Sequence, residues 1–364
     1  MKVLIPCSGY GRIYRGVESW VEYLSKEFVK NGLEVYILCG QETYLNRKNG
    51  VKILKFPILK RESLIYKQRP FEEISTLIES ASLSISSFPY FLASKFDVIL
   101  TPQWSDLYSN FILKWFKKIK TVFCFHSSPR KLTKILYLPI SFNSVNEIIA
   151  VSEFVKTNIK KVFGVDSKVI YNGVDTHIFR PIKIEKDRKI VSLLYVGSLL
   201  RKKGIYTLID VVKELDKEQL ELLIVGHGPE EKNIRNLIKS NKIGNIKLLG
   251  KVSLQKLIKI YNYSDIVIIP SEYPEALPIV ALEAMACGKP IIASNIGGLG
   301  EIIKKSKGGL LFEPINEKDL IEKILELANN NQKRKILGKN GRKFAKKELD
   351  WSKISEKYIK IMEN

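Results

Sequence analysis

The sequence lacks long apolar runs. None of its 364 residues belongs to a stretch of the roughly 20 apolar residues that a helix needs to span a bilayer. At its start, Met1-Lys2 leads straight into residues 3–6, an apolar run too short for a signal peptide and without a small-residue cleavage site. These absences argue against a membrane-spanning or secreted protein. We expect a cytoplasmic protein whose first strand is residues 3–6.

Cysteine and histidine are also scarce. The four cysteines lie far apart and form no CxxC pair, and three histidines leave a zinc site few ligands. We therefore expect buried free thiols and no metal site. The residues concerned are Cys7, Cys39, Cys124 and Cys287, with His126, His177 and His227.

Acidic residues number 38 against 60 lysines and arginines, which leaves a net charge of +22. Nucleic acid, an anionic membrane surface or a negatively charged substrate could each account for this excess. Lysine and isoleucine are abundant and glutamine is scarce, so lysine as the default surface residue of a heat-adapted or AT-rich genome is a fourth explanation. Charge alone does not decide among them.

Short apolar runs alternate with helical patterns in both halves of the chain, which predicts α/β domains with parallel sheets and helices on both faces. A polar stretch at residues 180–188 separates the halves. Expected strands are 3–6, 35–39, 97–101, 121–125, 147–151, 190–196, 220–225, 247–249, 266–270 and 290–293. Expected helices are 17–31, 205–215, 231–241, 254–263 and 278–287, with two or three more in 320–364.

We therefore expect two Rossmann-like domains, residues 1–180 and 181–345, facing each other across a cleft. Residues 346–364 should form a helix that packs back on the first domain. Ligands of doubly wound domains bind at the carboxyl ends of the strands.

The densest functional signal lies in residues 270–303. A strand ends at Pro270, a loop carries Glu275, and a helix begins near Pro278, since proline is tolerated in a first turn. The first turn of a helix presents unpaired N–H groups and a positive dipole end, which suit a phosphate. Glu283 follows one and a half turns into the helix. The pattern predicts one carboxylate at the mouth of the cleft and a second one deeper.

This segment resembles family 4 of the retaining glycosyltransferases, which have the GT-B architecture. The resemblance is carried by the pair Glu275 and Glu283, by Glu-Ala-Met-Ala-x-Gly-x-Pro at 283–290 and by Gly-Gly-x-x-Glu at 297–301. It covers essentially the whole chain, though weakly from about residue 40 to 95. It implies that Glu275 contacts the transferred sugar and Glu283 holds the ribose hydroxyls. Backbone amides of residues 277–280 would meet the sugar hydroxyls and the distal phosphate.

Residues 195–204 resemble the family loop that grips the diphosphate, where fixed positive charge is needed because the leaving nucleotide gains negative charge. Lys203 matches the family lysine. The family often has an arginine where this chain has Ser198, and Arg201 could either reach the same phosphate or be a solvated surface residue. The full implied donor-binding set is Gly16, Ser198, Arg201, Lys203, Gly226, Val252, Ala276, Leu277, Pro278, Ile279, Val280 and Glu283.

In the N-terminal half, the glycine-rich residues 9–18 follow the first strand, and Gly16 matches the second glycine of a family pair that faces the donor phosphates. His126 ends a strand and should point into the cleft. The resemblance gives it a donor-orienting or catalytic role beside Glu275, and a structural histidine is the alternative. The family retains anomeric configuration without an obvious enzymic nucleophile, so the resemblance implies a same-face reaction with the leaving phosphate as base.

Residues 107–146 contain seven Lys or Arg and no Asp or Glu. Within them, aromatic and basic residues mix at helical spacing, which suits either an anionic membrane surface or an ordinary helix with its apolar face in the core. The candidate membrane residues are Lys114, Trp115, Phe116, Lys117 and Lys118.

The sequence thus predicts an enzyme that moves a sugar from a UDP-, GDP- or ADP-sugar to a hydroxyl of a glycan or lipid-linked acceptor. Cell-surface polysaccharide or glycolipid synthesis, at the inner face of the cell membrane, is the expected setting. No cofactor and no metal are expected, because there is no convincing Asp-x-Asp and Lys203 with helix N-termini can supply the charge. A nucleotide-sugar epimerase on the same fold, an inactive scaffold and a basic nucleic-acid-binding protein are the alternatives, although no nucleic-acid motif is present.

Overall fold

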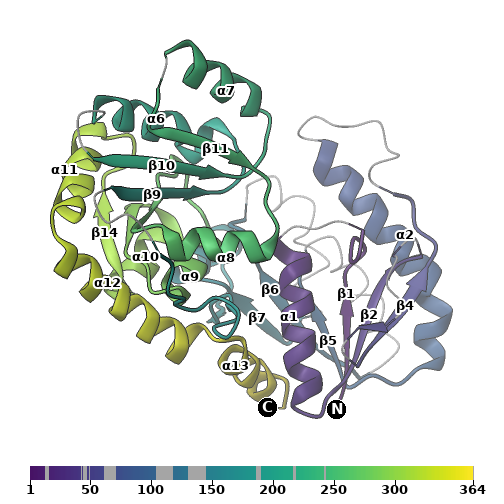
Figure 1. Cartoon of the computed structure of the whole chain (residues 1–364). Helices are drawn as coiled ribbons and strands as arrows, with labels where there is room; N and C mark the ends of the chain where they lie inside the picture. Colours follow the sequence, from purple (N-terminus) through teal and green to yellow (C-terminus); the bar gives the residue numbers. More distant parts are fainter. Residues whose placement is uncertain are drawn as a thin grey trace. The chain divides into compact units, whose positions relative to one another are not determined.

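The computed structural model describes residues 1–12, 16–41, 43, 47–48, 50–60, 71–103, 118–129, 145–185, 190–215, 219–241 and 243–363. The chain divides into two compact units (Figure 1). One comprises Met1–Asn172 together with Trp351–Asn364, and the other comprises Gly173–Asp350. The sequence places these divisions after residues 180 and 345 instead.

The N-terminal unit is built on an eight-stranded sheet of order β3-β4-β2-β1-β5-β6-β7-β8. The two-residue β3 pairs antiparallel with β4, and every other neighbouring pair is parallel. The strands are β1 (Lys2–Pro6), β2 (Glu34–Gly40), β3 (Arg47–Lys48), β4 (Val51–Phe56), β5 (Val98–Thr101), β6 (Lys120–Phe125), β7 (Glu147–Ala150) and β8 (Lys168–Val169). The inner strands β1 and β5 are almost wholly buried, as helices on both faces require.

The last helix of the chain belongs to this unit, as the sequence predicts. Tyr358 of α13 (Trp351–Glu363) is fully buried, and its ring packs edge-on against Trp20 of α1 (Gly16–Lys30) at 5.6 Å between centroids. The Tyr358 hydroxyl lies 3.1 Å from the Cys124 thiol. Among the described residues of the unit, helices α2 (Phe71–Ala93) and α5 (Glu153–Phe163) are also found.

The C-terminal unit contains a six-stranded parallel sheet of order β11-β10-β9-β12-β13-β14. The chain runs outward from β9 to β11 and then returns to the other side of β9 with β12. Loops that follow β9 and β12 therefore meet at a topological switch point, where ligands of such sheets bind. The strands are β9 (Val191–Val196), β10 (Leu220–Val225), β11 (Ile246–Gly250), β12 (Ile266–Ile269), β13 (Ile291–Ser294) and β14 (Gly309–Phe312).

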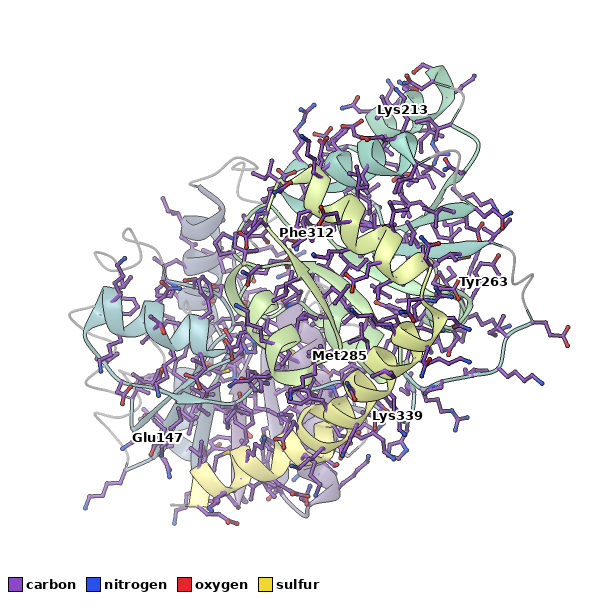
Figure 2. The ribbon with its side chains drawn as sticks, turned by 90° about the vertical axis from the view of Figure 1, so that its left-hand side faces the viewer. Glu147, Lys213, Tyr263, Met285, Phe312 and Lys339 are labelled. Carbon is purple, nitrogen blue, oxygen red and sulfur yellow. The ribbon has the colours of Figure 1, made fainter. Side chains whose placement is uncertain are left out.

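Helices cover both faces of this sheet, and Phe312 lies in the core between them (Figure 2). The α/β fold predicted from the sequence is confirmed, and most element bounds agree to within two residues. The helices are α6 (Ile205–Glu214), α7 (Glu231–Ser240), α8 (Leu254–Tyr263), α9 (Ile279–Ala286), α10 (Gly297–Ser306), α11 (Glu317–Ala328) and α12 (Asn331–Phe344), with a 3-10 helix (Arg201–Lys203) and a π-helical turn (Ala345–Leu349).

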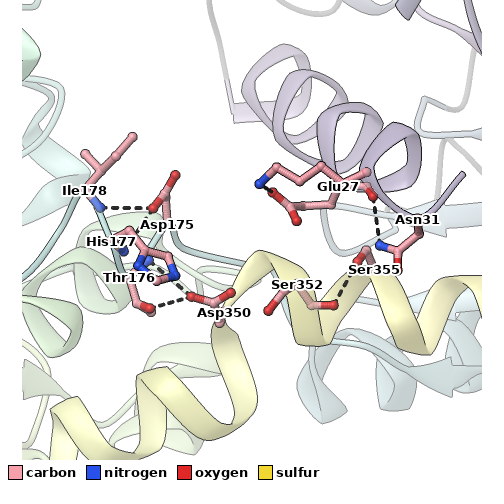
Figure 3. A network of polar contacts seen from close by, with 10 residues as sticks. Glu27, Asn31, Asp175, Thr176, His177, Ile178, Asp350, Ser352 and Ser355 are labelled. Atoms are coloured by element: carbon pink, nitrogen blue, oxygen red, sulfur yellow. Dashed lines mark hydrogen bonds and ion pairs between the residues drawn. The ribbon is translucent and has the colours of Figure 1, made fainter. Parts of the chain in front are cut away.

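Tertiary contacts explain why the C-terminal unit begins at residue 173 and ends at residue 350. The Asp350 carboxylate accepts hydrogen bonds from the backbone N–H and the hydroxyl of Thr176 (Figure 3). Arg342 donates to the carbonyl oxygens of Thr176, Phe179 and Ala286 at 2.7–3.0 Å. The sequence pattern shows the polar stretch after Pro181 but not these contacts. The predicted boundary therefore lies at the polar stretch.

The four cysteines are buried free thiols, as expected. In the part of the chain that the structure describes, no helix is both long and apolar enough to cross a membrane. Lys114, Trp115, Phe116 and Lys117 of the candidate membrane segment lie outside the described residues, and Lys118 is exposed.

Candidate functional site

The two loops at the switch point of the C-terminal sheet are joined backbone to backbone. Gly204 has φ +70°, and a Cβ at this position would lie only 1.7 Å from the carbonyl oxygen of Pro270. The N–H of Glu272 donates to the carbonyl of Lys202 at 3.0 Å. Only glycine combines this φ with so close an approach, so Gly204 fixes the position of the preceding Lys203.

Gly204→Ala is therefore expected to lower the free energy of unfolding by about 3 kcal/mol, through left-handed strain and the clash with Pro270. Urea unfolding of the whole chain measures this loss. Gly244→Ala is the matched control, because a Cβ at Gly244 would meet nothing within 4 Å. Equal stability of the two variants would contradict the assigned role of Gly204.

Glu275 and Lys203 form the central ion pair of this site. The Glu275 side chain is 10% exposed; its Oε2 accepts a hydrogen bond from Lys203 Nζ at 2.6 Å, and its Oε1 accepts one from the Ser271 hydroxyl. The Glu275 carbonyl accepts the N–H of Gly298 at 2.8 Å, and a Cβ at Gly297 would lie 2.6 Å from that carbonyl. The Gly-Gly pair therefore holds the loop that carries Glu275.

The three consecutive cations of the 3-10 helix have different partners, and Arg201 is separated from the two lysines, which both lie near the Tyr273 ring. Arg201 is largely exposed, and its Nε lies 3.4 Å from the Glu230 carboxylate. The Lys202 ammonium lies 4.4 Å from the centre of the Tyr273 ring, and Lys203 reaches Glu275. Ser198 is exposed, and its carbonyl accepts the hydroxyl of Tyr195 at 3.0 Å.

Glu283 lies on α9, which begins directly after Pro278, as the sequence predicts. Pro278 provides no side-chain cap for the first turn of α9, where a helix has amides without intrahelical acceptors, and the Ala281 amide donates to the Pro278 carbonyl at 3.1 Å. One Glu283 oxygen accepts the hydroxyl of the fully buried Tyr261 at 2.7 Å. As whole residues, Glu275 is buried and Glu283 is partly exposed, and the depth of their carboxylates in the cleft stays a prediction.

Burial of the Glu283 carboxyl raises its pKa to about 7, against the lowering effect of the hydrogen bond from Tyr261. In the folded state the carboxyl therefore keeps its proton at pH values where the unfolded chain has lost it. The protonated Glu283 carboxyl therefore contributes to the free energy of unfolding in full below the usual carboxyl pKa. This contribution is lost as pH rises through about 7.

Glu283→Gln mimics the protonated form and removes this loss. We expect the variant to match the wild type near pH 4.5 and to exceed its free energy of unfolding by about 1–3 kcal/mol at pH 8. Urea unfolding at several pH values tests this expectation. A stability difference that does not change with pH would show that Glu283 ionises normally.

His126 follows β6 in the N-terminal unit. Its ring packs edge-on against Trp20 at 4.7 Å, and its Nε2 is buried without a hydrogen-bond partner among the described residues. Burial lowers the pKa of His126 to about 3, although a contact with Asn172 acts in the opposite direction. The imidazole is therefore neutral at physiological pH. Gly16 of the expected phosphate-facing pair is the first residue of α1 in the same unit.

The structure brings only part of the predicted donor set together. Lys203 meets Glu275, and Gly226, at φ +144°, would place a Cβ 1.8 Å from the carbonyl of Gly197, so it supports the same loop. Arg201 instead pairs with Glu230. Val252 follows β11, and the remaining predicted residues, Ala276, Leu277, Pro278, Ile279 and Val280, form the loop after Glu275 and the first turn of α9.

Two aromatic residues of the site are absent from the sequence-based set. Tyr261 holds Glu283, and Tyr273 lies under the ammonium groups of Lys202 and Lys203, at 4.4 and 5.3 Å from its ring centre. Tyr261 occupies an apolar position of a helix, and Tyr273 lies in an irregular loop, so periodicity marks neither. Within the described ranges, no group of three or more His, Cys, Asp or Glu side chains is arranged to hold a metal ion.

Comparison with known proteins identifies the family. Residues 14–178 match Glycosyltransferase Family 4, and residues 175–344 match Glycosyl transferases group 1. An uncharacterized glycosyltransferase of Methanocaldococcus jannaschii is 31% identical over 369 residues, covering 100% of this chain and 98% of that protein.

Two solved structures show the fold. Sucrose-phosphate synthase from Thermosynechococcus elongatus is similar with a TM-score of 0.84 and 19% identity, over 100% of this chain and 98% of that one. HepE of Anabaena, solved in complex with UDP-glucose, is similar with a TM-score of 0.77 and 19% identity, over 100% of this chain and 99% of that one. The fold is therefore GT-B, and the chain belongs to the group 1, or family 4, glycosyltransferases.

Proposed function

We propose that this glycosyltransferase moves a sugar from a nucleoside diphosphate donor to a hydroxyl acceptor with retention of anomeric configuration. The observation that carries the proposal is the ion pair of Lys203 and Glu275, formed by two loops at the switch point of the C-terminal sheet. HepE, which has the same fold, is solved with UDP-glucose, and this supports a nucleotide sugar as the donor.

In this proposal the chemistry is mainly electrostatic. The ammonium of Lys203 and the positive N-terminal end of α9 neutralise the charge that grows on the leaving diphosphate, which is where fixed positive groups lower a barrier most. Glu283 accepts the ribose hydroxyls, and Glu275 orients the sugar. The pair with Glu275 holds the Lys203 side chain in place before the donor binds.

We propose no enzymic nucleophile. Both carboxylate oxygens of Glu275 already accept hydrogen bonds, one from Lys203 and one from Ser271. The leaving phosphate would then act as the base on the face from which it departs, and neutral His126 would donate or accept a hydrogen bond at the sugar. Lys203 supplies the charge that a divalent metal provides in other transferases, so chelation of metals should leave the rate unchanged.

The acceptor and cellular setting are also proposals: a glycan or lipid-linked hydroxyl, in the synthesis of a cell-surface polysaccharide or glycolipid on the inner face of the membrane. The net charge of +22 supports contact with an anionic surface. Sedimentation with vesicles tests the contact, and equal binding to neutral and anionic lipid would exclude an electrostatic role for the segment around Lys118.

The experiment that tests the proposed activity is a screen of UDP-, GDP- and ADP-sugars by thermal shift and nucleotide release. We expect one donor to raise the melting temperature and to be hydrolysed slowly without acceptor. If no nucleotide sugar and no free nucleotide stabilises the protein, the donor site does not function as proposed. Conversion of a donor into another nucleotide sugar would favour an epimerase instead.

A further inference from the structure

Helix α12 is basic throughout its length. Six of its 14 residues are lysine or arginine, and none is aspartate or glutamate. Other surface helices hold acids that balance some of their cations, as Asp319 does for Lys323 in α11 at 3.3 Å. Helices α7, α10 and α13 contain similar pairs three or four residues apart. Because α12 has no such acid, a general abundance of lysine on the surface does not by itself explain its charge.

Three of the six cations of α12 bind other parts of the same unit. Lys333 forms an ion pair with Glu326 of α11. Arg334 donates to the carbonyl oxygen of Ala328 at 2.7 Å. Arg342 donates to three further carbonyl oxygens at 2.7–3.0 Å. These contacts fasten α12 to the unit and use the charges on its inner side.

The other three cations, Lys335, Lys339 and Lys343, form what we call the basic face. They recur at every fourth position, which places them on one side of the helix, and all three are exposed. Among the described residues, none of the three forms an ion pair. Like charges at this spacing repel one another, so the basic face weakens the isolated helix and favours contact with an external anion. Figure 2 shows Lys339 on this helix.

Two neighbouring residues indicate which anionic partner fits the basic face. Lys307 at the end of α10 is exposed, and its carbonyl accepts the side-chain amide of Asn340 at 3.2 Å, so a further ammonium group lies beside α12. Ile336 is 52% exposed and lies one turn before Lys339. An aliphatic side chain among ammonium groups fits a bilayer interface, where lysines meet lipid phosphates and the apolar group meets acyl chains. A nucleic acid backbone offers no such apolar layer.

We propose that the basic face of α12 docks the C-terminal unit on an anionic lipid surface, with Ile336 entering the headgroup layer. This inference rests on the proposed setting at a membrane and assigns the contact to residues far along the chain from the segment around Lys118. Each lysine beside an anionic leaflet is attracted by its surface potential, and salt screens this attraction. Docking through three adjacent lysines is therefore firm at low salt and weaker at physiological salt.

The test is sedimentation of the full chain with two kinds of vesicle, at low and at physiological salt. One kind contains phosphatidylglycerol and phosphatidylcholine in equal parts, and the other contains phosphatidylcholine alone. The triple variant Lys335→Gln, Lys339→Gln, Lys343→Gln should bind the mixed vesicles about 100-fold more weakly than the wild type, because each lysine contributes roughly fivefold. Neither protein should bind the neutral vesicles appreciably.

The matched control removes the same charge elsewhere in the C-terminal unit. Lys213→Gln, Lys232→Gln and Lys239→Gln together change exposed residues of α6 and α7. Figure 2 shows Lys213 at the other end of this unit from Lys339. Because exposed charges far from the docking face are screened, the control should bind the mixed vesicles within about threefold of the wild type.

Two further variants separate docking from an effect on folding. Replacing the three lysines of the basic face by arginine keeps their charge and should keep binding. Ile336→Ser should weaken binding to the mixed vesicles. The inference is overturned if the glutamine variant binds like its control, if the wild type binds neutral vesicles equally well, or if Lys118→Gln alone carries the loss. Tighter binding of a short DNA duplex than of the mixed vesicles would also overturn it.

Nucleotide release from the donor is measured on the same proteins. Normal release without vesicle binding in the wild type overturns this inference and leaves the proposed transfer reaction standing. Vesicle binding that follows the basic face, without any stabilisation by a nucleotide sugar, overturns the proposed donor site and leaves the docking surface standing.

Discussion

Replacing Lys203 by alanine is expected to lower kcat/KM for sugar transfer by about 10³-fold, which is the usual loss when one fixed charge-stabilising group is removed from a transition state. Two effects combine in this variant. The leaving diphosphate loses its nearest proposed cation, and the buried Glu275 loses the partner that compensates its charge. Initial rates of nucleotide release, measured over a range of donor concentrations, give kcat and KM separately.

The ion pair also predicts how a second substitution behaves. Glu275→Gln in the Lys203→Ala background removes the buried unpaired charge, so stability should recover while activity stays low. Lys213→Ala controls for the change in net charge. If Lys203→Ala kept its rate within threefold of the wild type, the central role of this lysine would be wrong.

The second large effect concerns stability of the N-terminal unit. Tyr358→Ala should lower the free energy of unfolding by about 4 kcal/mol, because the residue is fully buried and removal of a large core ring leaves a cavity. That cavity would lie against Trp20, whose ring also supports His126. Chemical unfolding followed by tryptophan fluorescence measures the loss.

Tyr358→Phe is the matched control, because it removes only the hydroxyl that lies 3.1 Å from the Cys124 thiol. Its cost should be about 1 kcal/mol or less. If the alanine and phenylalanine variants unfold at the same denaturant concentration, α13 does not depend on packing of this ring.

Much of the fold could be predicted from the sequence, because buried parallel strands are short apolar runs. Helix α2 shows why some elements were missed. Ile78 and Ile85 are exposed on it at 37% and 73%, whereas Glu79 and Ser80 are fully buried. Glu79 binds the Ser8 hydroxyl at 2.7 Å, a contact with the loop after β1. A helix whose polar residues are buried and whose apolar residues are exposed cannot be predicted from hydrophobic periodicity.

The site could be predicted to the extent that its chemistry is encoded in a local motif. Glu275, Glu283 and Lys203 stand at fixed spacings from glycines and prolines, and these residues can be identified from the sequence. The direction of a side chain is not local information: Arg201 and Lys203 are two residues apart, yet one faces Glu230 and the other Glu275. Tyr261 of α8 belongs to the site through a tertiary contact, its hydrogen bond to Glu283 of α9.

The most direct test of the account is calorimetric titration of the wild-type chain and of Lys203→Ala with the nucleoside diphosphate of the preferred donor. The account predicts saturable binding at one site in the wild type and an affinity about 100-fold lower in the variant, since a charge-assisted contact to phosphate is lost. Equal affinity in the two proteins would contradict the placement of the diphosphate at the pair of Lys203 and Glu275.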